Sequence, residues 1–278
     1  MTNNAYGTID KTDKPVSGGA RPARWGAALI IGLSFIAALA LVVCATPIFK
    51  LTDIQVSGNS YYKKSAIVDK SGLRLGQNGL YALRGYNPIK IFSLRCAAAE
   101  QSVLAACPYV KTVQARYVAP KSVHIEVEER VKSVVVPYHN SALLIDDEGV
   151  VVDIARDCGE PGLPVVNGLP VSQYNVGKQL RSEDGAKVNA LLMVISALKQ
   201  ADRDSEEALS PSVTGIDLAD PKNIALILGE RLRINLGDGA ELYYKVSVAK
   251  EIISNGISGD ESGTINFYDG ARPVFMPG

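Results

Sequence analysis

Histidine is the side chain that most often acts as a general base near neutral pH, and this chain has only two. His124 lies in a stretch where polar and apolar residues alternate, so the pattern favours a solvent-facing strand residue over a catalytic base. His139 stands close to Ser141, and together they could supply a base and a nucleophile. Such near neighbours in sequence seldom reach the geometry that nucleophilic catalysis needs, so the histidines give little support for a hydrolase.

Carboxylates gather at Asp146, Asp147 and Glu148, where a calcium loop is conceivable. An EF-hand requires a longer ligand series that ends in Glu, and that series is missing here. Because Gly149 follows directly, the cluster favours a charged hairpin turn.

The four cysteines show none of the spacings of a structural zinc site. Cys96 and Cys107 are eleven residues apart, which on one helix places them on the same face but about 16 Å from each other. A disulfide needs Cα atoms within about 7 Å, so these two should stay unpaired. We expect Cys96, Cys107 and Cys158 to be free thiols, the first two as small core residues.

Composition and motifs exclude several common functions. Twenty-nine Lys and Arg balance 29 Asp and Glu, so no basic face is predicted that would bind nucleic acid. The phosphate-binding pattern GxxxxGKS/T, the dinucleotide pattern GxGxxG after a strand and the nucleophile pattern GxSxG do not occur. The sequence therefore predicts no catalytic, cofactor-binding or metal site, and a protein that is not an enzyme.

The N-terminal region has the pattern of a membrane anchor. Residues 1–24 are polar and rich in Gly, Ser, Asn and Pro, which predicts a disordered cytoplasmic tail. Residues 25–49 carry no charge, and a helix of this length can cross a hydrocarbon core of about 30 Å. Arg21 and Arg24 precede the run and favour an N-in orientation, with the bulk of the chain extracytoplasmic. A signal peptide cleaved after Ala45 is the alternative.

Residues 50–131 have the pattern of a small domain with helices on one face of a three-stranded sheet. Apolar residues at every second position predict the strands, while Gly72 and Pro108 end the two helices. The expected elements are, in order, a strand at 51–57, a helix at 60–70, a loop at 72–90, a helix at 94–106 and strands at 112–117 and 123–128.

Residues 132–278 predict a larger domain, with helices packed on a mostly antiparallel sheet, so the whole chain is of the α+β class. A capping box formed by Asp238 and Glu241 is expected at the start of the second helix. The expected elements are strands at 134–138, 142–145 and 150–154, a loop at 159–170, a helix at 183–202, strands at 213–217, 223–228 and 231–236, a helix from 240, and strands at 264–268 and 272–276 around Asp269–Gly270.

This layout of tail, anchor, βααββ domain and larger β domain resembles the FtsQ/DivIB family of bacterial cell-division proteins. The stretches FKLTDIQVSGNSYY and CPYVKTVQARYVAPKSVHIEVEER resemble the first strand and the last strand pair of the family's POTRA domain. The stretches SALLIDDEGVVVD, LGDGAELYYKVSVAKEII and GTINFYDGARPVFMP resemble the start and the C-terminal part of its β domain. The resemblance thus implies a POTRA-like domain at 50–131 and an FtsQ/DivIB-type β domain at 132–278.

The resemblance implies a function in protein binding. It suggests a single-pass membrane scaffold at the division septum that binds FtsB/DivIC-like and FtsL-like subunits, without a cofactor, and helps regulate a septal peptidoglycan synthase. Two other classes stay open from the residues: an anchored cell-surface hydrolase, and a secretion or transport adaptor that uses its POTRA domain.

Two binding surfaces are predicted. The last strands should lie at or near a sheet edge, where unpaired backbone groups can accept a strand from a partner. In the alternative, Phe267, Tyr268 and Phe275 simply complete the core. The predicted partner-binding residues are Thr264, Ile265, Asn266, Phe267, Tyr268, Pro273, Val274, Phe275, Tyr243 and Tyr244, and the predicted docking residues of the POTRA-like domain are Ile54, Gln55, Val56, Ser57, Gly58 and Asn59.

Overall fold

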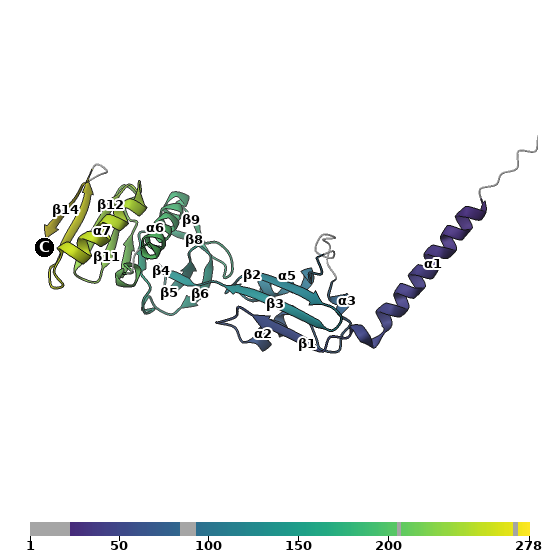
Figure 1. The fold of residues 1–278 in the computed structure, drawn as a ribbon. Helices are drawn as coiled ribbons and strands as arrows, with labels where there is room; N and C mark the ends of the chain where they lie inside the picture. Colours follow the sequence, from purple (N-terminus) through teal and green to yellow (C-terminus); the bar gives the residue numbers. More distant parts are fainter. Residues whose placement is uncertain (1–22, 84–92, 205–206, 269–271) are drawn as a thin grey trace, which may run out of the picture. The chain divides into compact units, whose positions relative to one another are not determined.

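A computed structural model describes residues 23–83, 93–204, 207–268 and 272–278 (Figure 1). Most of the predicted tail, up to residue 22, and the predicted turn Asp269–Gly270 lie outside this described part. The chain divides into two units, Met1–Phe49 and Lys50–Gly278.

The first unit contains helix α1, Ala23–Ala45, followed by the 3-10 turn η1, Pro47–Phe49. The helix ends two residues before Pro47, consistent with the backbone restriction that a proline imposes. Large apolar side chains along α1 are exposed, including Leu29 and Leu33 at 73% each. Within the described residues, no helix meets the length and hydropathy needed to cross a bilayer, so the predicted transmembrane helix over 25–49 is not confirmed.

The second unit begins with the predicted βααββ arrangement. In the described chain three strands form a sheet in the order β1 (Asp53–Ser57), β3 (Ser122–Glu129), β2 (Val110–Val118). Strands β1 and β3 run parallel, which requires the helical crossover between them. The helices are α2 (Lys64–Ser71), the short α3 (Gly79–Ala82), which the sequence did not predict, and α5 (Ala97–Ala106).

Strict alternation gives the small sheet one buried face. Val123, Ile125 and Val127 of β3 are at most 3% exposed, and Ile67 of α2 and Val103 of α5 are also fully buried. Gly72 ends α2 in the left-handed conformation, as predicted. Cys96 and Cys107, which flank α5, are buried free thiols, and Cys158 is half-buried and free, which confirms the prediction for all three.

The larger sheet is mixed. In the described part of the chain it has nine strands, with five antiparallel and three parallel pairings. The order is β14 (Arg272–Pro277), β13 (Gly263–Tyr268), β12 (Leu232–Gly237), β11 (Ile224–Leu228), β10 (Gly215–Asp217), β7 (Val165–Asn167), β4 (Lys132–Tyr138), β5 (Ser141–Asp146), β6 (Val151–Ala155). A separate two-stranded ribbon pairs β8 (Val171–Gln173) with β9 (Arg181–Ser182).

The predicted loop at 159–170 is wrong in part, because it contains the strand β7. This strand runs parallel to both neighbours, β4 and β10, and joins the two halves of the sheet. Three residues are too few for an alternation to be recognised from the sequence.

Helices α6 (Gly185–Arg203) and α7 (Leu242–Gly256) pack against one face of the larger sheet and enclose its main core (Figure 1). Asp184 caps α6 by accepting from the backbone amides of Ala186 and Lys187. The predicted capping box of α7 is wrong: Glu241 itself is the N-cap, has a left-handed backbone (φ 54°) and makes no side-chain cap bond. Asp238 instead accepts from the Ala240 amide within the preceding loop.

Candidate partner-binding surfaces

Strand β14 is the outermost strand of the larger sheet, as predicted for the end of the chain. Within the described residues it pairs only with β13, so the backbone groups on its outer side have no ladder partner. Pro273, which lacks a backbone N–H, is tolerated in such an edge strand. Strand β13, in contrast, lies between β12 and β14 and has no free edge.

The side chains of β13 are largely buried. Ile265 and Phe267 lie in the main core and are at most 5% exposed, which confirms the core alternative for Phe267. Asn266 is also buried, and its side-chain oxygen accepts a 2.5 Å hydrogen bond from the Asn235 amide. Thr264 is half-buried, and the side chain of Tyr268 lies outside the described part. Ile265, Asn266 and Phe267 are at most 5% exposed, so their side chains offer a partner almost no surface.

Strand β14 presents alternating side chains. Val274 is 49% exposed, whereas Pro273 is half-buried and Phe275 packs against the main core. Met276 is 44% exposed and lies on the same side of the strand as Val274. The prediction from sequence missed Met276, although the same alternation identifies it. The edge therefore offers unpaired backbone together with two exposed apolar side chains.

Tyr243 and Tyr244 lie on α7 and are 39% and 46% exposed. The Tyr243 hydroxyl donates a 2.7 Å hydrogen bond to Asp204 at the end of α6, and this bond raises the pKa of the tyrosine above its usual value. Tyr243 therefore links the two helices, while the ring of Tyr244 remains available to solvent.

The predicted docking residues of the first sheet lie on its outermost strand β1 and the following turn. Ile54 is half-buried and Val56 is buried, while Gln55 is exposed and bonds to Asp53. Gly58 has a left-handed backbone (φ 78°), and a Cβ there would overlap the carbonyl oxygen of Val127. In the same segment, Ser57 bonds to His124 at 3.0 Å and Asn59 donates to the Tyr62 carbonyl. Docking at this segment stays a prediction.

His139 and Ser141 do not form a base–nucleophile pair. The Ser141 hydroxyl donates to the Tyr138 carbonyl at 3.0 Å, and the His139 ring packs edge-on against the Tyr138 ring. His124 is exposed on β3, as its alternation predicted. Among the described residues, no group of three or more His, Cys, Asp or Glu side chains could hold a metal ion.

The acidic turn after β5 is a junction between the two sheets. Arg130, which directly follows β3, bonds to the fully buried Asp146 and also to Glu148. Lys111 of β2 pairs with Glu148 at 3.0 Å, and Lys199 of α6 pairs with Asp147 at 2.8 Å. Each carboxylate thus has a cation, which confirms the charged turn and identifies its partners.

These pairings shift the pKa of the turn's carboxylates. The hydrogen bond from Arg130 lowers the pKa of Glu148 below its usual value. Burial alone would raise the pKa of Asp147, but its bond with Lys199, the positive charges of Lys199 and Lys111 and a backbone hydrogen bond together outweigh burial and lower it. Both groups therefore stabilise the fold in their charged form.

An aromatic cluster forms the apolar part of the same junction. The Tyr109 ring stacks on Tyr61 with centroids 3.8 Å apart and packs on Val135 and Leu144 of the larger sheet. Its hydroxyl donates a 2.8 Å hydrogen bond to Asp153. Burial and this carboxylate raise the pKa of Tyr109. Ionic and aromatic contacts together join both sheets into one unit.

A small three-stranded sheet, in which β1 runs parallel and β2 antiparallel to the central strand β3, precedes a large mixed sheet, and this arrangement defines a POTRA-containing architecture. Residues 49–130 match the model of the POTRA domain of FtsQ type, and residues 134–266 match that of the C-terminal region of cell division protein FtsQ/DivIB. The chain belongs to the FtsQ/DivIB family of cell division proteins. The matched residues end within β13, so β14 lies beyond them.

Curated relatives agree with this assignment. The cell division protein DivIB of Clostridium tetani is 23% identical over 230 residues, which cover 82% of this chain and 79% of the relative. The cell division protein FtsQ of Corynebacterium glutamicum is 25% identical over 219 residues, which cover 78% of this chain and 82% of the relative. The similarity therefore spans both sheets of the second unit.

Proposed function

We propose that this protein is a non-catalytic, membrane-anchored scaffold of the division machinery. It binds FtsB/DivIC-like and FtsL-like single-pass subunits and so helps regulate septal cell-wall synthesis. The observation that carries the proposal is the unpaired outer edge of β14, in a chain of the FtsQ/DivIB family.

The edge suits strand addition. A partner strand laid along β14 would form main-chain hydrogen bonds with its free side. Val274 and Met276 would then contact alternate apolar side chains of the partner, while Phe275 keeps the strand fixed to the core. Apolar anchors at a fixed two-residue spacing give such an interaction its register and specificity.

The proposed interface is tested by placing a charge on β14 and, as a control, on the strand at the opposite edge of the same sheet. Strand β6 is the other outermost strand, and its Ile154 is 42% exposed, close to the 49% of Val274. Val274→Glu in the full chain should abolish binding to the FtsB-like ectodomain without changing the melting curve, whereas Ile154→Glu should bind like the parent. Equal binding by both variants, or a loss that occurs only because Val274→Glu unfolds, would refute the edge as the interface.

Membrane anchoring at the septum is the second part of the proposal. Its support is the uncharged run at 25–49, the preceding Arg21 and Arg24, and the exposed apolar side chains of α1. Protease added to wall-stripped cells should digest the chain beyond residue 50 and spare the N-terminal tail. A mature protein that starts near Thr46 would contradict the anchor, and a fluorescent fusion that does not collect at midcell would contradict the septal location.

A further inference from the structure

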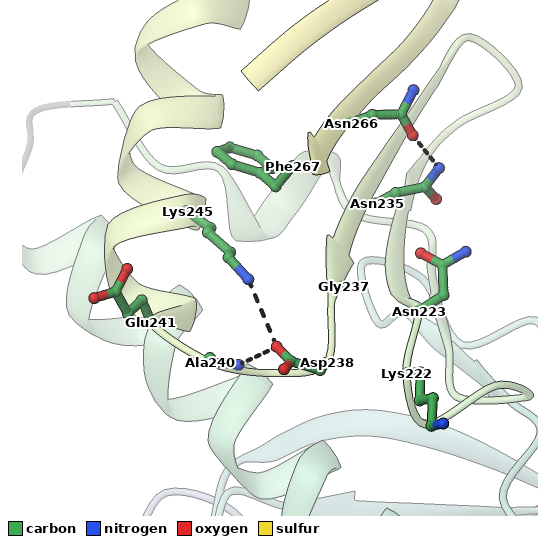
Figure 2. Close-up of a pocket in the computed structure, with 10 residues that line it drawn as sticks. All are labelled: Lys222, Asn223, Asn235, Gly237, Asp238, Ala240, Glu241, Lys245, Asn266 and Phe267. Carbon is green, nitrogen blue, oxygen red and sulfur yellow. Dashed lines mark hydrogen bonds and ion pairs between the residues drawn. The ribbon is translucent and has the colours of Figure 1, made fainter. Parts of the chain in front are cut away.

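A pocket of about 590 Å³ lies at one end of the larger sheet, where β12 and β13 separate. The ladder between these strands stops at the pair Asn235–Asn266, although the strands continue to Gly237 and Tyr268. The loop after β12, the start of α7 and the loop before β11 complete the walls (Figure 2). A pocket of this volume is typical of a site for a small ligand.

Lys245 places a buried ammonium group on one wall of this pocket. Its side chain is only 3% exposed, and it donates a 2.6 Å hydrogen bond to the Leu236 carbonyl. In the described chain the only carboxylate within 4 Å of the ammonium is that of Asp238, at 4.0 Å, and this side chain is 70% exposed. A charge removed from water is costly unless a counterion lies close, so Lys245 lacks the close anion that its burial calls for.

Asn266 lies on another wall of the pocket. Its Nδ2 is shielded from solvent and has no hydrogen-bond partner among the described residues. Exchanging nitrogen and oxygen in both amides does not remove the problem, because Asn235 Oδ1 already accepts a 3.0 Å bond from Arg233. A buried donor without an acceptor is uncommon, but solvent cannot reach this one, so we assign it no part in ligand binding.

We propose that this pocket binds a small ligand through a carboxylate group, held by the Lys245 ammonium. In Figure 2 the Lys245 ammonium points toward Asp238, whereas the amide nitrogen of Asn266 points away from both side chains. A carboxylate fits better than a phosphate, because the exposed Asp238 and Glu241 line the same pocket and repel a higher negative charge. A peptide C-terminus and a free organic acid share this chemistry.

Titration of the full chain with three probes tests the chemistry and separates the two sources. N-acetyl-Ala-Ala carries the carboxylate, its C-terminal amide lacks it, and succinate is a free acid. A carboxylate site should bind N-acetyl-Ala-Ala at least about tenfold more tightly than the amide, since charge-assisted hydrogen bonds are the stronger ones. Preference for succinate would identify a free organic acid as the source. Equal binding of the peptide acid and its amide, or no saturable binding of any probe, would overturn the proposal.

Variants separate a ligand site from a structural lysine. Lys245→Met should abolish carboxylate binding and leave the unliganded melting temperature unchanged or raised, because it removes a poorly paired buried charge. Lys250→Met is the matched control: this buried lysine has an ion pair with Asp202 at 3.6 Å, so its loss should lower the melting temperature and leave binding intact.

Asp238→Asn keeps folding and binding distinguishable if Lys245→Met fails to fold. The variant removes the negative charge that competes for Lys245, while the amide oxygen can still accept from Ala240. Carboxylate binding should tighten about threefold or more. Unchanged or weaker binding in Asp238→Asn, or a lower melting temperature in Lys245→Met with binding retained, would overturn the proposal.

Discussion

Removing Arg130 should expose how strongly the two sheets of the second unit depend on one ion pair. Its guanidinium is 13% exposed and bonds to Asp146, which is fully buried. The change Arg130→Met retains most of the side chain's apolar length and deletes the charge. Asp146 then stays in the interior without its cation, because Glu148 and Val150 offer it only backbone N–H groups.

The expected cost follows from these contacts. Breaking a buried ion pair by removing one partner typically costs about 3–5 kcal/mol. Since Asp146 keeps two backbone hydrogen bonds, we expect the low end, about 3 kcal/mol, which corresponds to a fall in Tm of about 6–12 °C for a unit of this size. Lys111→Met is the control, because it breaks only the more exposed pair with Glu148 and should cost at most about 0.5 kcal/mol.

Urea unfolding of the full chain, followed by circular dichroism, measures both variants. The double variant Arg130→Met with Asp146→Asn should recover part of the loss, since a neutral amide is less costly to bury than an unpaired carboxylate. If Arg130→Met costs under about 1 kcal/mol, or the double variant is the sum of its single changes, the reasoning fails, because Asp146 is then satisfied by its backbone bonds alone.

Three further outcomes are expected. The folded-state pKa values of Asp147 and Glu148 are lowered, so the stability that these carboxylates contribute is fully present above their unfolded pKa values of about 4. This contribution is lost as the pH falls further. Urea midpoints that do not drop between pH 5 and pH 3 would contradict this expectation. Gly58→Ala should lower the free energy of unfolding by about 2 kcal/mol or more, because the added Cβ would meet backbone atoms and the residue has a left-handed conformation. Gly72 has a similar φ but open space around it, so Gly72→Ala should cost only about 1 kcal/mol. Thermal melts measure both variants, and equal losses would refute the steric argument. Burial raises the pKa of Cys96 to about 11, so this thiol should react with a thiol reagent at pH 8 only in denaturant, and fast labelling of native protein would contradict its burial.

The alternation of polar and apolar residues along the sequence predicted the small sheet well. Alternation over 112–117 and 123–128 identified β2 and β3 and the buried side of each, and Gly72 marked the end of α2. These features depend on residues that are close in sequence, so periodicity and glycine conformation are sufficient to predict them.

Features that depend on distant residues could not be predicted in this way. The pairing of Arg130 with Asp146 joins two sheets, and nothing local distinguishes Asp146 from the exposed members of the same turn. Asn266 looked like a surface residue by alternation, yet it is 3% exposed and its side chain bonds to Asn235 of the neighbouring strand β12. Glu241 has the spacing of a capping box, but the tertiary path of the loop forces it into a left-handed conformation that excludes that cap. The sequence thus predicted that β14 lies at a sheet edge, but it did not predict which side chains on β13 and β14 are exposed to solvent.

The narrow attachment of β7 has a mechanical consequence. Its pairing with β4 registers a single residue pair, Val135 with Val165, whereas every other pairing in the larger sheet registers three or more among the described residues. Tension applied in the plane of the sheet, from β14 on one side to β6 on the other, is transmitted from ladder to ladder in series. The seam between β4 and β7 has the fewest registered residue pairs to share that force, so it should yield first and set the load at which the sheet parts into two halves.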